Sequence, residues 1–247
     1  MKFHKLGGRD EAGYRVALYG GGRPFWYRWL DSKRVAPSSD PEAPPLVEVV
    51  EKIREDDFYS YHLALVAGGE TRRWIIATDS MKPGDLIRTF GGIPRMPVKP
   101  VPGDAHPLGA LPIGTTVCCV EVIPGQGASI ARAAGTFATY LRKNGDMCVL
   151  QMPSKRELSV SERCMAVVGR VSNLEHENFQ WGSANAKRFA GHKQHTGLWH
   201  RKTGRFGRKI RPPKPMISFD PNTGVTTIQK KKRSALVDDS DVFRSEI

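Results

Sequence analysis

The most restrictive feature of this sequence is a long stretch of a single charge sign towards its C-terminus. Residues 178–219 contain no Asp or Glu, yet they hold ten of the 38 Lys and Arg residues. The stretch therefore carries +10 of the formal net charge of +13. Like charges repel, so this part cannot collapse into a core of its own and stays extended unless an anion neutralises it. The ten bases are Lys187, Arg188, Lys193, Arg201, Lys202, Arg205, Arg208, Lys209, Arg211 and Lys214.

Large aromatic residues and glycines are interleaved with these bases. Trp181, Phe189, Trp199 and Phe206 lie within the stretch, and glycines interrupt it, which argues against a long helix. Aromatic rings stack on unpaired bases and guanidinium groups pair with phosphates, so the pattern is typical of RNA binding. A merely solubilising tail would have no use for the rings. We therefore interpret residues 178–219 as a phosphate-binding arm.

The remainder of the chain predicts short strands and a mainly β fold. The apolar runs 62–66 and 74–77 flank Gly68 and Gly69, and the runs 138–143 and 147–152 flank Asn144 and Gly145; both patterns predict hairpins. Residues 117–123 and 165–171 also predict strands, and residues 48–57 favour a strand over a helix. No segment has a sustained helical period of apolar residues.

Proline positions suggest how the chain divides. The stretch 91–112 holds six prolines and marks a boundary between two small β-barrels. The predicted domains are residues 1–95, residues 96–177, the basic arm 178–219 and a surface tail 220–247.

Several functional classes are disfavoured. No apolar run is long enough to span a membrane. The four cysteines include no Cys-x-x-Cys pair, which disfavours a structural zinc site, and reduced thiols are expected. His192, His195 and His200 lie close together in the sequence, but the cationic surroundings without a nearby carboxylate disfavour a metal. No nucleophile–base pair or paired carboxylates indicate an enzyme, and no cofactor is expected beyond magnesium carried by RNA.

Basic and glycine-rich positions outside the arm are candidate RNA contacts. Gly20, Gly21 and Gly22 let backbone approach a phosphate and are followed by Arg23 and Arg28. The pair Arg72 and Arg73, the loop Gly125 to Gly127 followed by Arg132, and the turn residues Lys155 and Arg156 add further candidates. Each has a plainer alternative, a flexible turn or a solvated charge. The small residues 133–136 permit close packing on RNA or on neighbouring chain.

Ordered motifs along the chain resemble the large-subunit ribosomal protein two family. On the N-terminal side they are GGRD (7–10), GGG (20–22), YRWLD (27–31), ALVAGG (64–69) and RWIIA (73–77). Further along they are GDAHPLGALPIGT (103–115), PGQG (124–127), ARAAGT (131–136), LQMPS (150–154) and VGRVSN (168–173), followed by Glu175 and His176. Many motifs in one order are far more specific than any single motif.

This resemblance implies an OB-fold barrel, an SH3-like barrel and an irregular extension threaded into large-subunit ribosomal RNA. It implies a structural ribosomal protein near the peptidyl-transferase centre, where RNA performs the chemistry, that supports subunit assembly and subunit joining. Its partners would be that RNA, neighbouring large-subunit proteins and the small subunit. The resemblance adds Asn173, His176, Lys187, Arg188, Gly191, Lys193, Trp199, His200, Arg201, Lys202, Arg205, Arg208, Lys209 and Arg211 as candidate RNA contacts.

The chain departs from the family pattern at several of these positions. Arg23 and Pro24 replace the usual His-Lys after the glycines, and Ser183 and Ala186 replace bases. His200 matches the first histidine of a loop directed towards the catalytic region, while Lys202 replaces the second. His200 is thus the candidate for a supporting role in peptidyl transfer, with RNA anchoring as the alternative.

Residues 103–108 and 207–212 resemble the mitochondrial branch of the family, which implies a protein of the mitochondrial matrix. The first residues lack an Arg- and Ser-rich amphipathic leader, so either a leader has been removed or the organelle assignment fails. The alternative function is a free-standing RNA-binding or RNA-chaperone protein.

Overall fold

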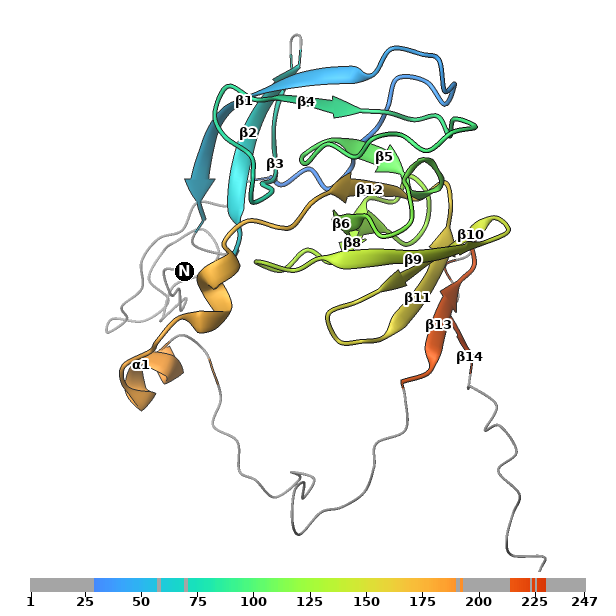
Figure 1. Ribbon diagram of the computed structural model, residues 1–247. Helices are drawn as coiled ribbons and strands as arrows, with labels where there is room; N and C mark the ends of the chain where they lie inside the picture. Colours follow the sequence, from blue (N-terminus) through green and yellow to red (C-terminus); the bar gives the residue numbers. More distant parts are fainter. Residues whose placement is uncertain are drawn as a thin grey trace, which may run out of the picture.

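The computed structural model describes residues 29–56, 59–68, 71–189, 192, 214–222, 224 and 226–229. Within these residues the protein is mainly β, as the sequence predicts, and its strands form two barrel-like units (Figure 1). No helix in the described part is long and apolar enough to cross a membrane.

The first unit is built from four antiparallel strands, of which the first lies between the second and the fourth. Its strands are β1 (Leu46–Glu55), β2 (His62–Gly68), β3 (Thr71–Ile76) and β4 (Leu86–Thr89). β1 pairs with both β2 and β4, and β2 pairs with β3, which confirms the predicted hairpin and the strand at residues 48–57. Val50, Ala64, Val66, Ile75 and Ile87 belong to the core of this unit.

The second unit follows the proline-rich loop. Its elements are β5 (Ala105–Pro107), the 3₁₀ turn η1 (Leu108–Ala110), β6 (Thr116–Cys118), β7 (Val120–Glu121), β8 (Ala128–Ile130), β9 (Ala138–Asn144), β10 (Met147–Gln151), β11 (Glu157–Ser161) and β12 (Met165–Val168). β9 and β10 form the predicted hairpin, with Asn144 paired to Met147. The turn residues are therefore Gly145 and Asp146, and Gly145 has the positive φ of 59° that such a turn requires.

The two units share one continuous sheet and part of one core. The strand order of this sheet is β14-β13-β11-β10-β9-β6-β12-β5-β4-β1-β2-β3, and β5 links the units because it pairs with β4 on one side and β12 on the other. A cluster between them joins Leu63 and Ile76 of the first unit to Cys118 and Val167 of the second. The barrels are consequently packed together rather than joined by a free linker.

The elements of the C-terminal region do not follow the division into a basic arm, residues 178–219, and a tail, residues 220–247, that was based on charge. After η2 (Leu174–Asn178) and α1 (Ala184–Phe189), residues 193–213 lie outside the described part. β13 (Met216–Phe219) then pairs with β11 and with β14 (Thr226–Gln229). Ile217 and Phe219 pack against the second core. The end of the predicted arm and the start of the predicted tail thus form a hairpin, β13–β14, on the barrel. Apolar residues follow Lys214, the last base of the arm, and they can pack on the barrel core.

Candidate nucleic-acid interface

Three segments far apart in sequence meet where the two units join. Asn173, in the left-handed conformation with φ 64°, donates its side-chain amide to the Ser60 carbonyl at 2.7 Å. The Ser172 hydroxyl accepts the His62 amide at 3.0 Å, and the Ser172 carbonyl accepts the Gly135 amide at 3.1 Å. These contacts tie the loop before β2 to the small-residue loop 131–136 and to the segment after β12.

This junction gathers three of the predicted RNA contacts. Burial raises the pKa of Tyr61 to about 12, although the nearby Arg132 guanidinium acts to lower it. Tyr61, Asn173 and His176 line one cavity. Gly135, with a φ of 66°, packs so tightly that a Cβ would lie 3.3 Å from Leu174 Cα. The small residues at 133–136 thus serve intramolecular packing at this glycine.

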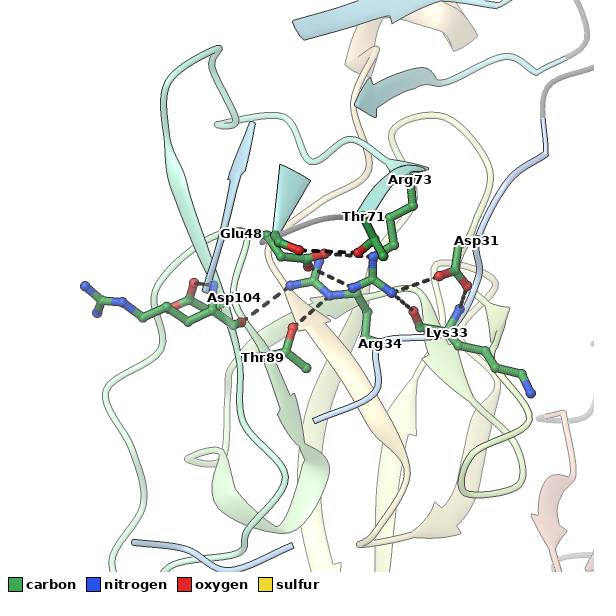
Figure 2. Close-up of polar contacts among 10 residues, drawn as sticks. Asp31, Lys33, Arg34, Glu48, Thr71, Arg73, Thr89 and Asp104 are labelled. Atoms are coloured by element: carbon green, nitrogen blue, oxygen red, sulfur yellow. Dashed lines mark hydrogen bonds and ion pairs between the residues drawn. The ribbon is translucent and has the colours of Figure 1, made fainter. Parts of the chain in front are cut away.

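The adjacent arginines of β3 point in opposite directions. The Arg72 side chain is 71% exposed and pairs with Glu51 at 3.0 Å, so it is accessible to a phosphate. Arg73 instead lies inside, where its Nε and Nη2 donate to the two oxygens of Glu48, each at 2.8 Å (Figure 2). Its Nη1 donates to Asp31 Oδ2 at 2.8 Å. In place of the RNA contact predicted for Arg73, the structure therefore gives this guanidinium two internal carboxylates.

A buried arginine, Arg34, lies beside this network, and sequence reasoning missed it. Arg34 lies beside Arg73 in Figure 2, and its Nε donates to the Thr89 hydroxyl at 3.1 Å. Burial lowers the pKa of Arg34, an effect that the nearby Glu48 carboxylate partly offsets. For Arg73, burial also acts to lower the pKa, but the hydrogen bonds that it donates to Glu48 and Asp31 outweigh burial and raise the pKa. The network anchors residues 31–34 to the first barrel.

The glycine loop of the second barrel has its amides occupied. The buried carboxylate of Glu121 accepts the amides of Gly125 and Gly127 at 3.0 Å each and that of Met165 at 3.1 Å. Gly127 is buried, and a Cβ there would lie 2.7 Å from the Ser32 hydroxyl. In place of the predicted RNA contact, Gly127 packs against residue 32. Gly125 is exposed with open space beside it, so its surface remains accessible.

Other predicted bases are solvent-accessible. Lys155 is exposed at the tip of the β10–β11 connection, with a φ of 62°, and Arg156 beside it is half-buried. Lys214 donates to the Ser154 carbonyl at 2.7 Å, which brings a third base to the same turn. Lys187 and Arg188 are exposed on α1. Among the described residues, none of the bases Lys155, Arg156, Lys187 and Arg188 forms an ion pair with a carboxylate. The β10–β11 connection and α1 therefore each offer cations to a phosphate backbone.

The remaining candidates lie outside the described residues and stay predictions. They are Gly20, Gly21, Gly22, Arg23, Arg28, Gly191, Lys193, Trp199, His200, Arg201, Lys202, Arg205, Arg208, Lys209 and Arg211. His192 lies within the described residues, and its ring packs edge-on against that of Trp181, with ring centroids 5.2 Å apart. Within the described residues, no three His, Cys, Asp or Glu side chains come together as a metal site requires.

Comparison with known proteins places these features in context. A family model described as "Ribosomal Proteins L2, C-terminal domain" matches residues 101–209. The large ribosomal subunit protein uL2 of Salinibacter ruber is 36% identical over 192 residues, which cover 77% of this chain and 64% of that protein. The protein of the same name from Cytophaga hutchinsonii is 38% identical over 196 residues, which cover 78% of this chain and 66% of that protein. The chain thus spans just under two thirds of the length of these curated relatives.

Proposed function

This chain belongs to the uL2 family of large ribosomal subunit proteins, and from that membership we propose that it is a structural constituent of the large subunit of a mitochondrial ribosome. It binds large-subunit ribosomal RNA near the peptidyl-transferase centre and supports subunit assembly and association. The observation that carries the proposal is the similarity over more than three quarters of the chain to two proteins named as ribosomal components.

The positions of the exposed bases support an RNA-binding role. Exposed or half-exposed cations lie on β3 (Arg72), on loops of the second barrel (Arg132 and Lys155) and on α1 (Lys187 and Arg188). Such cations fix register on a folded RNA through its phosphates rather than through base sequence. The protein therefore acts as a scaffold, without a cofactor of its own, and magnesium belongs to the RNA. His200 anchors RNA rather than transferring a proton.

The two curated relatives are bacterial and do not support the mitochondrial part of the proposal. That part rests on the resemblance of residues 103–108 and 207–212 to the mitochondrial branch of the family. Neighbouring large-subunit proteins and the small subunit complete the set of partners. The basic residues from Lys187 to Arg211 penetrate the RNA, since their charge needs an anionic environment, whereas residues 216–219 form a strand on the second barrel.

Sedimentation of organelle lysate tests the proposal. The lysate is run on sucrose gradients at moderate and high salt and blotted for this chain. An integral component stays with the large subunit through the high-salt wash, because many contacts and a buried extension hold it in addition to salt-sensitive phosphate pairing. A free-standing RNA chaperone runs near the top of the gradient or washes off early, which would refute the ribosomal assignment. Absence from organelle fractions, with sedimentation on cytosolic ribosomes, would refute only the mitochondrial part.

A further inference from the structure

A large cavity opens beside the junction of the two units. It has a volume of about 500 Å³ and lies between the loop joining β1 to β2 and residues 173–181. Two aromatic pairs contribute to its walls. Tyr59 and Tyr61 are stacked with ring centroids 5.0 Å apart, and Phe179 and Trp181 meet edge to face at 4.9 Å. The cavity falls within the size range of ordinary ligand pockets.

The charge of this cavity is opposite to that of the chain. Glu55, Asp56 and Glu175 line it together with His62 and His176, and none of its described lining residues is a lysine or arginine, although Arg132 lies near the Tyr61 hydroxyl. The chain as a whole has a net charge of +13. Aromatic faces combined with carboxylates attract guanidinium and ammonium groups, through cation–π contact and charge-assisted hydrogen bonds. The three carboxylates outnumber the single arginine near the wall, so the cavity chemistry favours a cationic side chain over a phosphate.

A basic segment of the same chain precedes Leu30, which belongs to the same hydrophobic cluster as two tyrosines of the cavity wall. Leu30 packs in the same hydrophobic cluster as Tyr59 and Tyr61, and it bridges to Trp74 of β3. The residues that precede this point, 1–28, contain six Lys and Arg residues and only two acids. A segment tethered at that position reaches the cavity at a high effective concentration, which a separate basic protein does not have.

We propose that in the RNA-free chain this cavity, lined by Tyr59, Tyr61, Phe179, Trp181 and the carboxylates of Glu55 and Glu175, binds a lysine or arginine side chain of residues 1–28. The inference concerns the free chain and goes beyond the ribosomal role. It predicts that the N-terminal bases are held by the protein's own carboxylates before any RNA is bound.

Photo-cross-linking of the purified full-length chain, free of RNA, tests this directly. Phe179 is 55% exposed at the cavity and is replaced by p-benzoylphenylalanine; Leu86, 57% exposed on β4, takes the same probe as the control. The expected result is cross-links from position 179 to residues 1–28, mapped by mass spectrometry, with no such cross-links from position 86. Cross-links from position 179 to the arm or to a second copy, or no cross-links, would overturn the proposal. Cross-linking that appears only after RNA is added would make the cavity a nucleobase site and overturn it as well.

Two matched sets of charge substitutions separate specific docking from general electrostatics. One variant replaces the six N-terminal bases with Gln: Lys2, Lys5, Arg9, Arg15, Arg23 and Arg28. The control replaces six bases of the arm: Arg201, Lys202, Arg205, Arg208, Lys209 and Arg211. The N-terminal set lowers the cross-link yield from position 179 by about tenfold, the loss expected when a favourable cation contact disappears, and the arm set leaves it unchanged. Equal loss in both variants would show that net charge, and not the cavity, holds the segment.

Discussion

The two neighbouring arginines of β3 make the sharpest prediction, because they are chemically identical and differ only in the face of the strand they occupy. We consider Arg73→Gln and Arg72→Gln. The Glu48 side chain that pairs with Arg73 is only 4% exposed, whereas Arg72 and its partner Glu51 are 71% and 30% exposed. Loss of Arg73 leaves a buried carboxylate without its main counter-ion.

The expected costs follow from that difference in burial. Breaking a buried ion pair by removing one partner costs about 3–5 kcal/mol, while an exposed pair contributes about 0–1 kcal/mol. For a chain of 247 residues these values correspond to a fall in Tm of roughly 6–20 °C for Arg73→Gln and of a few degrees at most for Arg72→Gln. Adding Glu48→Gln to Arg73→Gln recovers part of the loss, since the unpaired buried charge disappears.

Urea unfolding followed by circular dichroism measures these free energies, and an unchanged m-value shows that the unfolded reference is the same. Binding to a large-subunit RNA fragment at several salt concentrations supplies the second readout. Arg72→Gln reduces the salt slope by about one, as loss of one phosphate contact does, and Arg73→Gln leaves the slope unchanged. Equal unfolding costs for the two variants, or a cost below about 1 kcal/mol for Arg73→Gln, would refute the assignment of Arg73 to the internal network.

Three further predictions concern groups inside the barrels. Glu121→Gln replaces one accepting carboxylate oxygen with an NH₂ group, which cannot accept a hydrogen bond from a backbone amide. The substitution therefore lowers the free energy of unfolding by about 1–3 kcal/mol and speeds hydrogen exchange at Gly125 and Gly127. Glu157→Gln, which removes only the exposed pair with Arg142, is the control, and unchanged exchange at both glycines would contradict the role of Glu121. Burial, with a smaller contribution from Arg34, lowers the pKa of His106 from 6.5 to about 4. The imidazole of His106 therefore binds a proton more readily in the unfolded chain than in the folded chain. As pH falls from 6.5 towards 4, the wild type loses stability relative to His106→Leu. A stability difference that does not change with pH would contradict this prediction. All four cysteines are buried, and burial raises the pKa of Cys164 to about 12. Iodoacetamide at pH 8 therefore labels no thiol rapidly in the folded chain and all four in denaturant, whereas fast labelling of the native protein would show that the barrel core is open.

Local chemistry accounts for the parts of the fold that the sequence predicts correctly. The β2–β3 and β9–β10 hairpins follow from apolar runs that flank turn residues, and Gly145 supplies the positive φ that the second turn needs. The separation of charge between residues 178–219 and the rest of the chain is likewise a property of composition. The predicted boundary between arm and tail does not match the strands, because charge marks where bases end and not where strands begin.

The sequence alone determined the fold class, the hairpins and the candidate RNA contacts as a set, since these depend on neighbours within a few residues. Only the tertiary structure decided which members of that set face inwards. Strand alternation places Arg72 and Arg73 on opposite faces, but the choice of face rests on Glu48 and Asp31, which lie 25 and 42 positions away. Gly125 and Gly127 differ for the same reason, because a segment from another part of the chain covers one and leaves the other open. Strand pairing within the first barrel brings Glu48 to Arg73, and the docking of residues 31–34 brings Asp31 to Arg73 and Ser32 to Gly127. The local sequence pattern does not contain these distant contacts.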